Sequence, residues 1–232
     1  MKQLVLFACL LSAAGAAQSQ TAEEVGDADS FNRDVVYLGA KQTPFINLRG
    51  NCAGDPNCAV LNAQPALTTI RRDNTAAFTL PGRVTNSLLC ATMTPLIGME
   101  LRNNTAVLQN AAGLATRAHF TIRNAVFDDP SLLNPGTGLP FNGEFALTIV
   151  THVESLSMVP SQRLARTIQT SRACNGALVS RTMLVNGLGL SNAQATQFFR
   201  NPTTIEIGVS ADATLAVTMS YALAVRLYGD RR

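Results

Sequence analysis

The C-terminal segment between Leu215 and Leu227 constrains the fold most, because apolar residues occupy every second position of it. Side chains alternate between the two faces of a β-strand, so this period predicts one long strand with one buried face. That face comprises Leu215, Val217, Met219, Tyr221, Leu223, Val225 and Leu227. The side chains of the opposite face are small up to Arg226. Another chain or layer could therefore approach that face closely. We therefore expect a central strand, followed by a short polar end at residues 229–232, of which residues 230–232 should be dispensable.

Shorter segments of alternating apolar and polar residues, separated by turn residues, indicate further antiparallel strands. They lie at 34–40, 45–48, 75–80, 115–127, 144–154, 166–174, 177–185 and 203–209. Asn175–Gly176 is a strong hairpin signal, since both residues tolerate the positive φ of a type I′ turn. Residues 210–213 are expected to form the last turn. The Asp-, Asn-, Pro- and Gly-rich stretch 128–143 is expected to be a loop.

One helix is predicted near residues 191–200. Ser191 and Gln194 form a capping box, and Asn201–Pro202 ends the helix. Phe198 and Phe199 are expected to pack it against a sheet. Together these patterns predict an all-β fold, an antiparallel β-sandwich of the jelly-roll or Ig-like type with this single short helix.

Residues 1–20 have the pattern of a secretory signal peptide. Lys2 precedes a short apolar run at 4–11, and small residues follow at 13–17. Cleavage after Ala17 and cleavage after Gln20 fit equally well. Residues 21–232 are then expected to form a single secreted or periplasmic β-sandwich domain. No later run reaches the roughly 18 apolar residues of a membrane helix, so we expect no transmembrane segment in the mature chain.

Four cysteines follow the signal peptide, namely Cys52, Cys58, Cys90 and Cys174. An even number in an exported chain indicates two disulfides. Of the three pairings we favour Cys52–Cys58 with Cys90–Cys174, because the Gly-, Asp-, Pro- and Asn-rich segment 52–58 can return its ends to bonding distance. A zinc site is disfavoured, since the spacing lacks the short C-x-x-C knuckle.

The charge pattern points to no nucleic-acid partner. The formal net charge is +3, and the arginines are scattered rather than gathered in a basic stripe. The absence of Trp and the presence of only 3 Tyr weaken a sugar-binding role, which usually needs aromatic platforms. The partner is therefore unknown from sequence, with self-association or a surface partner as the expected kinds.

Candidate catalytic groups are few. His119 and His152 are the two histidines, both in mid-strand, and no G-x-S-x-G nucleophile motif occurs. The acidic segment 23–34 and Asp128–Asp129 carry oxygen ligands suited to calcium, but the spacing is not that of an EF-hand loop. We read them as a solvated tail and as turn formers. No catalytic residue, metal ligand or cofactor is predicted.

These observations favour an exported, non-catalytic β-sandwich protein of the bacterial periplasm, cell surface or extracellular matrix, with a binding or structural role. One alternative is a secreted hydrolase that uses His152 or His119 with a carboxylate. Another is a fimbrial or filament subunit with strand exchange, in which the acidic N-terminal segment completes a neighbour's sheet.

Overall fold

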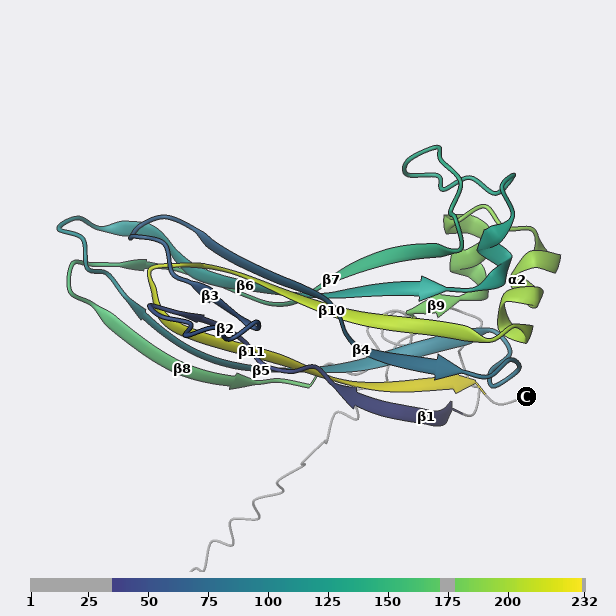
Figure 1. Ribbon diagram of the computed structural model, residues 1–232, viewed down its shortest axis with the longest axis horizontal. Helices are drawn as coiled ribbons and strands as arrows, with labels where there is room; N and C mark the ends of the chain where they lie inside the picture. The colour runs from purple at the N-terminus through teal and green to yellow at the C-terminus, as the bar shows by residue number, and fades with distance from the viewer. Residues whose placement is uncertain (1–34, 172–177, 231–232) are drawn as a thin grey trace, which may run out of the picture.

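A computed structural model describes residues 35–171 and 178–230, in which two β-sheets pack face to face along the long axis of the molecule (Figure 1). The seven-stranded sheet contains β1 (Val35–Gln42), β2 (Ile46–Arg49), β3 (Cys58–Val60), β5 (Leu88–Arg102), β8 (Arg163–Gln169), β9 (Val179–Ser180) and β11 (Ala216–Asp230). The four-stranded sheet has the order β4 (Thr68–Leu80), β10 (Thr203–Thr214), β6 (Gln109–Arg123) and β7 (Glu144–Met158). Paired strands are antiparallel, except that β2 and β3 run parallel. The predicted antiparallel β-sandwich is confirmed.

Strand β11 is central, as its sequence period predicts. It pairs with β5 from Ala216 to Gly229 on one edge, and with β1 and β2 on the other. Its inward residues are at most 2% exposed, namely Met219, Tyr221, Leu223, Val225 and Leu227. Val217 departs from this pattern. The register with β5 shifts between Ala216 and Thr218, so Val217 is the extra residue of a bulge and is only half-buried.

The long strand β5 is absent from the sequence-based predictions, because its buried start shows no alternation and Pro95 interrupts it. Proline lacks an N–H and is normally excluded from central strands. Here it costs no ladder hydrogen bond to β11. The opposite residue, Leu223, directs its N–H and C=O to the side chain and backbone of Thr43 instead.

Two predictions for the C-terminal half of the chain are wrong, namely the strand at 177–185 and the turn at 210–213. Of 177–185, only Val179–Ser180 is a strand, and Met183–Gly187 forms a π-helical turn. Strands β8 and β9 each pair with β5, so they do not form a hairpin with each other; Asn175–Gly176 itself lies outside the described residues. Residues 210–213 are not a turn, because β10 continues to Thr214 and the chain reverses at Leu215, whose φ is 54°.

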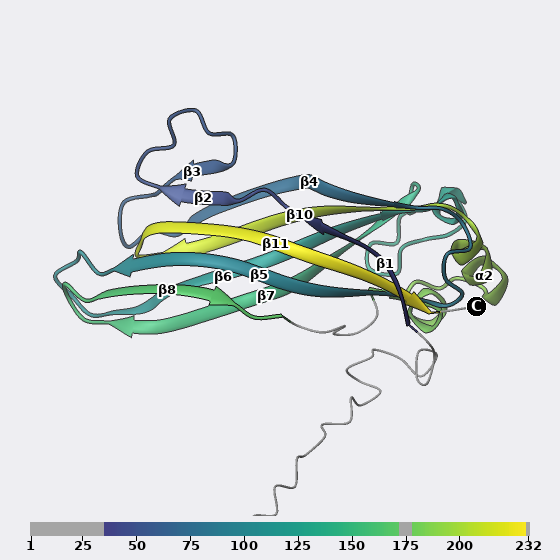
Figure 2. The ribbon, with the colours of Figure 1, turned by 90° about the horizontal axis from the view of Figure 1, so that it is seen from below.

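The predicted helix is present as α2 (Asn192–Arg200), with both hydrogen bonds of the Ser191–Gln194 capping box. Phe198 is fully buried and packs edge-to-face on Phe127, their ring centroids 5.9 Å apart. Phe127 belongs to a short 3-10 helix, Ala125–Asp128, that follows β6. The helix therefore covers one end of the sandwich, as Figure 2 shows.

The Cys52–Cys58 disulfide is confirmed, with a Cα–Cα distance of 5.5 Å. It closes the loop between β2 and β3. Cys90 is buried and also disulfide-bonded, but Cys174 lies outside the described residues, so the pairing of these two remains a prediction. The predicted signal peptide at 1–20 also falls outside the described part of the chain. Among the residues that the structure describes, no helix has the length and apolarity needed to cross a membrane.

The bulge in β11 generates a test with a matched pair of variants. Leu223→Asp places an unpaired carboxylate in the core and should prevent folding. Val217→Asp, six residues away on a half-buried bulge, should lower the unfolding free energy by only about 1 kcal/mol. Thermal unfolding followed by circular dichroism distinguishes them. Equal damage from both substitutions would contradict the register shift.

Candidate functional site

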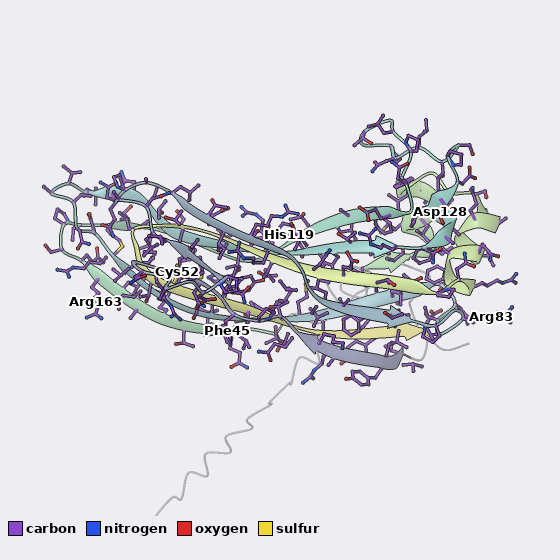
Figure 3. All side chains as sticks on the ribbon, viewed as in Figure 1. Phe45, Cys52, Arg83, His119, Asp128 and Arg163 are labelled. Atoms are coloured by element: carbon purple, nitrogen blue, oxygen red, sulfur yellow. A yellow bond between two sulfur atoms is a disulfide. The ribbon has the colours of Figure 1, made fainter. Side chains whose placement is uncertain are left out.

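His119 lies near the middle of the sandwich on the outer face of the four-stranded sheet (Figure 3). Strands β7 and β10 flank β6, and each places a hydroxyl against the ring. The Thr148 Oγ1 atom is 3.0 Å from Nδ1, and Ser210 Oγ is 2.8 Å from Nε2. The structure therefore brings together a serine and a histidine that the sequence did not connect.

This serine–histidine contact lacks two features of a catalytic dyad. The group at Nδ1 is a hydroxyl, whereas a general base is usually oriented and stabilised there by a carboxylate. Burial lowers the pKa of His119, and the positive charges of Arg71 and Arg117 lower it further, against an opposing effect of Asp73. These surroundings disfavour the imidazolium that a general base must form. The two hydroxyls instead give each ring nitrogen of His119 a hydrogen-bond partner.

His152 does have a carboxylate nearby, since its Nε2 is 3.8 Å from Glu154 Oε2. The same carboxylate forms an ion pair with Arg166 on β8, so these charges join the edges of the two sheets. His152 Nε2 is buried without a hydrogen-bond partner. A pocket of about 170 Å³ borders Glu154 and Ser155 but does not include His152. The predicted hydrolase pairing thus exists as a contact, and His152 does not line the pocket beside Glu154.

A pocket of about 610 Å³ lies at the end of the sandwich that carries α2. Three of its lining residues are arginines, Arg83, Arg181 and Arg200. The others are Thr85, Asn86, Thr196 and Phe199. Figure 3 places Arg83 at this end and Arg163 at the opposite end of the molecule. We call this cavity the arginine pocket.

Local structure directs the three arginines to this pocket. Arg83 follows β4 in a turn, with a φ of 67°, and its N–H donates to the Phe199 carbonyl at the end of α2. Gly82 is needed there, because a Cβ would collide with the Arg200 carbonyl oxygen. Arg181 donates to Thr196 Oγ1 over 2.7 Å and to the Asn192 carbonyl. Arg200 occupies the last turn of α2.

The Asp230 carboxylate binds the same loop between β4 and β5 a few residues after Arg83, at the pocket residues Thr85 and Asn86. It is fully buried at the end of β11 and accepts hydrogen bonds from the Thr85 hydroxyl, the Ser87 hydroxyl, and the backbone N–H groups of Asn86, Ser87 and Leu88. Burial alone would raise the pKa of Asp230, but hydrogen bonds led by Thr85 and Ser87 lower it to about 2. The expectation that residues 230–232 are dispensable is therefore wrong for Asp230.

The arginines of the described chain fall into two groups, those with a carboxylate partner and those without, and the second group includes the pocket arginines as well as Arg49, Arg72, Arg102 and Arg226 on the strands. Within the described chain, five arginines pair with carboxylates, namely Arg71, Arg117, Arg123, Arg163 and Arg166. In the same residues, no carboxylate oxygen lies within 4 Å of the guanidinium nitrogens of Arg83, Arg181 or Arg200. The carboxylate of nearby Asp230 accepts hydrogen bonds from two hydroxyls and three backbone N–H groups instead. Within the described residues, the pocket thus concentrates positive charge without a carboxylate that pairs with it.

A second hollow of about 550 Å³ lies on the outer face of the seven-stranded sheet. Its floor consists of small residues from β5, β8 and β11, namely Gly98, Ala165, Thr167, Thr218 and Ser220. Glu100 in its wall pairs with Arg163, and Arg49 donates to the Asn47 side chain. This hollow confirms that the outward face of β11 is small, but its charged groups already have partners.

The remaining candidates are structural. Asp129 accepts from the N–H and hydroxyl of Ser131 and from the Gln194 side chain, which makes it a turn former linked to α2. Between residues 35 and 230, apart from the undescribed 172–177, no three His, Cys, Asp or Glu side chains gather as a metal site would require. The acidic segment 23–34, including the proposed donor strand, lies outside the described residues.

Sequence reasoning treated the arginines as scattered and therefore missed the pocket. Two partial signals exist: Arg83 follows a Pro–Gly turn, and Arg200 ends the predicted helix. Neither signal shows that the two positions meet, since more than 100 residues separate them. Arg181 belongs to the segment that was expected to be a strand.

Comparison with known proteins assigns no family. No protein-family model and no curated protein matches the chain. A solved structure of infectious bursal disease virus, Gx strain, is similar at 10% identity and a TM-score of 0.27; the match covers 86% of this chain but only 32% of the viral one, so the chain spans about a third of its length. The 60-mer BFDV capsid protein is similar at 11% identity and a TM-score of 0.12, covering 73% of this chain and 96% of the other. TM-scores this low bear on neither fold nor function.

Asp230 provides a test of how the pocket wall is held. Its folded-state pKa of about 2 lies below the usual 3.8, so the ionised carboxylate stabilises the fold above about pH 4. That contribution is lost as the pH falls from 4 towards 2. Asp230→Asn should lower the unfolding free energy at pH 7 by about 2 kcal/mol, with a difference from wild type that shrinks below pH 4.

Chemical denaturation between pH 2 and pH 7 measures this difference. Asp73→Asn is the matched control, because Asp73 pairs with Arg71 on the exposed surface. Its effect should stay below about 1 kcal/mol. A pH-independent loss in Asp230→Asn would show that the carboxylate charge is not what stabilises this end.

Proposed function

We propose that this chain is an exported, non-catalytic β-sandwich protein of the bacterial periplasm, cell surface or extracellular matrix, and that it binds an anionic group in the arginine pocket. The observation that carries the proposal is the convergence of Arg83, Arg181 and Arg200 without a carboxylate partner. Export rests on the sequence of residues 1–20 and on the disulfide in the loop after β2.

The chemistry of the pocket favours carboxylate or phosphate. A guanidinium stays charged at every physiological pH and presents a planar fork of N–H donors, which matches the two oxygens of either group. Like charges in one pocket repel each other, and a bound anion relieves that repulsion. Asn86 and Thr196 add polar groups to the lining of the pocket.

The pocket suits binding better than conversion of its ligand. Its lining contains no histidine, cysteine or carboxylate to act as base or nucleophile. The two threonine hydroxyls are engaged, Thr85 with Asp230 and Thr196 with Asn192 and Arg181. Retention of an anion is therefore the activity that these groups support.

The hydrolase alternative has two contacts in its favour: His152 Nε2 is 3.8 Å from Glu154 Oε2, and Ser210 Oγ is 2.8 Å from His119 Nε2. Against it stand the hydroxyl at Nδ1 and the neighbouring arginines. Ser210 is also 6% exposed, which leaves little room for a substrate. The filament alternative keeps its N-terminal donor segment as a prediction, while the strand that follows, β1, is already paired with β11 of the same chain.

Anion binding is measured by isothermal titration calorimetry with citrate and with inorganic phosphate. Arg83→Gln and Arg200→Gln should each weaken binding by about tenfold or more, since a hydrogen bond to a charged group contributes about 1.5–3 kcal/mol. Arg163→Gln is the matched control, because it removes the same charge at the other end of the molecule. Equal affinities in all four proteins would overturn the proposal.

The hydrolase alternative is tested separately with a panel of ester, amide and glycoside substrates. We expect no turnover above the uncatalysed rate, and no change with His119→Gln or His152→Gln. Removal of a general base usually costs 10²-fold or more. An activity that falls by this factor in either variant would replace the non-catalytic proposal with the hydrolase.

A further inference from the structure

We propose that the end of the sandwich opposite α2 inserts an apolar tip into an anionic lipid surface. The apolar tip comprises Val107 and Leu108, in the loop between β5 and β6, and Val159 and Pro160, in the turn between β7 and β8. This surface is separate from the arginine pocket, and the inference does not depend on anion binding there.

One buried asparagine joins the two connections that carry the tip. Asn103 is 0% exposed, and its Nδ2 atom donates to the Val107 carbonyl and to the Met158 carbonyl, each over 2.8 Å. Its backbone N–H donates to the Gln162 carbonyl, and its own carbonyl accepts from the Ser161 N–H. The loop and the turn are therefore fixed to each other, and their apolar side chains form one surface.

The side chains of the apolar tip are open to solvent. Val107, Leu108 and Val159 are between 52% and 60% exposed, and Pro160 is exposed beside them. Single exposed apolar residues are common on soluble proteins, but a group of them in one place marks an interaction surface. The group here lies at the extremity of an elongated molecule, where it can meet a flat surface without hindrance from the sheets.

Backbone polar groups of the apolar tip already have hydrogen-bond partners. The Val107 carbonyl accepts from the Thr105 hydroxyl as well as from the buried asparagine. The Val159 N–H donates to Gln162 Oε1 over 2.9 Å, the Val159 carbonyl accepts from the Gln162 N–H, and Pro160 has no N–H to satisfy. Lipid offers backbone groups no hydrogen bonds, so these internal partners lower the cost of insertion.

Two arginines lie directly behind the apolar tip. Arg102 and Arg163 are register partners at the ends of β5 and β8, and like charges placed opposite each other in a sheet repel. Glu100 pairs with Arg163, but Arg102 forms no ion pair with any carboxylate in the part of the chain that the structure describes. Residues 101–110 and 158–163 contain no Asp or Glu. An anionic head group supplies the missing negative charge while the apolar side chains lie deeper in the lipid.

A second copy of the chain fits this surface less well than lipid does. A stable protein interface involves about 20–30 residues on each side, whereas the apolar tip offers four. Two copies that met tip to tip would also bring their Arg102 side chains together. A lipid surface attracts the same arginine.

A loop at the other end of the sandwich provides a comparison. Leu133 and Leu139, in the connection between β6 and β7, are 49% and 64% exposed. Asp128 and Asp129 precede them, and these carboxylates repel an anionic surface. Figure 3 places Asp128 and Arg163 at opposite ends of the molecule. The two ends thus expose similar apolar side chains beside opposite charge.

The first test uses the absence of tryptophan from the chain, which lets one introduced indole report its own surroundings. The probe is a vesicle of equimolar phosphatidylglycerol and phosphatidylcholine. The fluorescence of Leu108→Trp should shift to the blue on addition of vesicles and should be quenched by lipids brominated in their acyl chains. Leu139→Trp should show neither change. Unchanged emission from Leu108→Trp, or an equal shift in both variants, would overturn the proposal.

The second test measures the affinity for the same vesicles by co-sedimentation. Val107→Ser with Leu108→Ser should weaken binding by about tenfold, because two half-exposed apolar side chains no longer enter the lipid. Arg102→Gln should weaken it by about fivefold at low salt and by less at high salt. Leu133→Ser with Leu139→Ser is the matched control and should bind as wild type does. Both substituted pairs lie outside the hydrophobic core, so each variant keeps the fold.

Two further outcomes would assign the binding elsewhere. Arg83→Gln with Arg200→Gln should leave vesicle binding unchanged, and a loss in this variant would place the lipid head group in the arginine pocket instead. In sedimentation velocity without lipid, wild type should be a monomer. Dimers that Val107→Ser with Leu108→Ser abolishes would show that the apolar tip binds a second copy, and the lipid assignment would be wrong.

Discussion

The hydrogen bonds to the Asp230 carboxylate determine how one end of the sandwich is built. Strand β11 runs through the centre of the larger sheet, and its last described residue binds the loop between β4 and β5 through Thr85, Ser87 and three backbone N–H groups. An ionised carboxylate in a buried position is stable only with such donors. The same loop supplies one wall of the arginine pocket, so fold and candidate site share this interaction.

The same loop also contacts the end of α2 through its turn at Arg83. The Arg83 N–H satisfies the carbonyl of Phe199, one of the acceptors that a helix C-terminus leaves free. Arg83 and Arg200 also place positive charge near the negative end of the α2 dipole. That interaction explains why two cations are tolerated at the end of α2. It does not explain Arg181, which precedes the helix and donates a hydrogen bond to Thr196. The presence of all three arginines in one pocket is what points to an anionic ligand.

Sequence patterns failed where tertiary contacts altered the backbone period. The bulge at Val217 removes that side chain from the core, although its neighbours on the period-two face remain buried. A second bulge between β6 and β7 lets Thr151 turn inward, where its hydroxyl lies 3.0 Å from Tyr221 Oη of the other sheet and 2.8 Å from Thr116 Oγ1. Strand β5 was not predicted for a related reason. Pro95 fits in this strand only because the opposite residue, Leu223, makes its backbone hydrogen bonds to Thr43 instead.

The sequence by itself determined the all-β sandwich, the helix at 192–200 and the Cys52–Cys58 bridge, because each depends on residues close together in the chain. Period-two alternation, a capping box and a tight Gly/Pro turn act over short spans. The arginine pocket, the role of Asp230 and the contacts of His119 were decided only by the tertiary structure. Their members lie on separate elements. The pairing of β6 with β7 and β10 places Thr148 and Ser210 beside His119, and the contact between the β4–β5 loop and α2 brings Arg83 to the end of the helix that carries Arg200. Local sequence patterns cannot predict contacts between residues that are far apart in the chain.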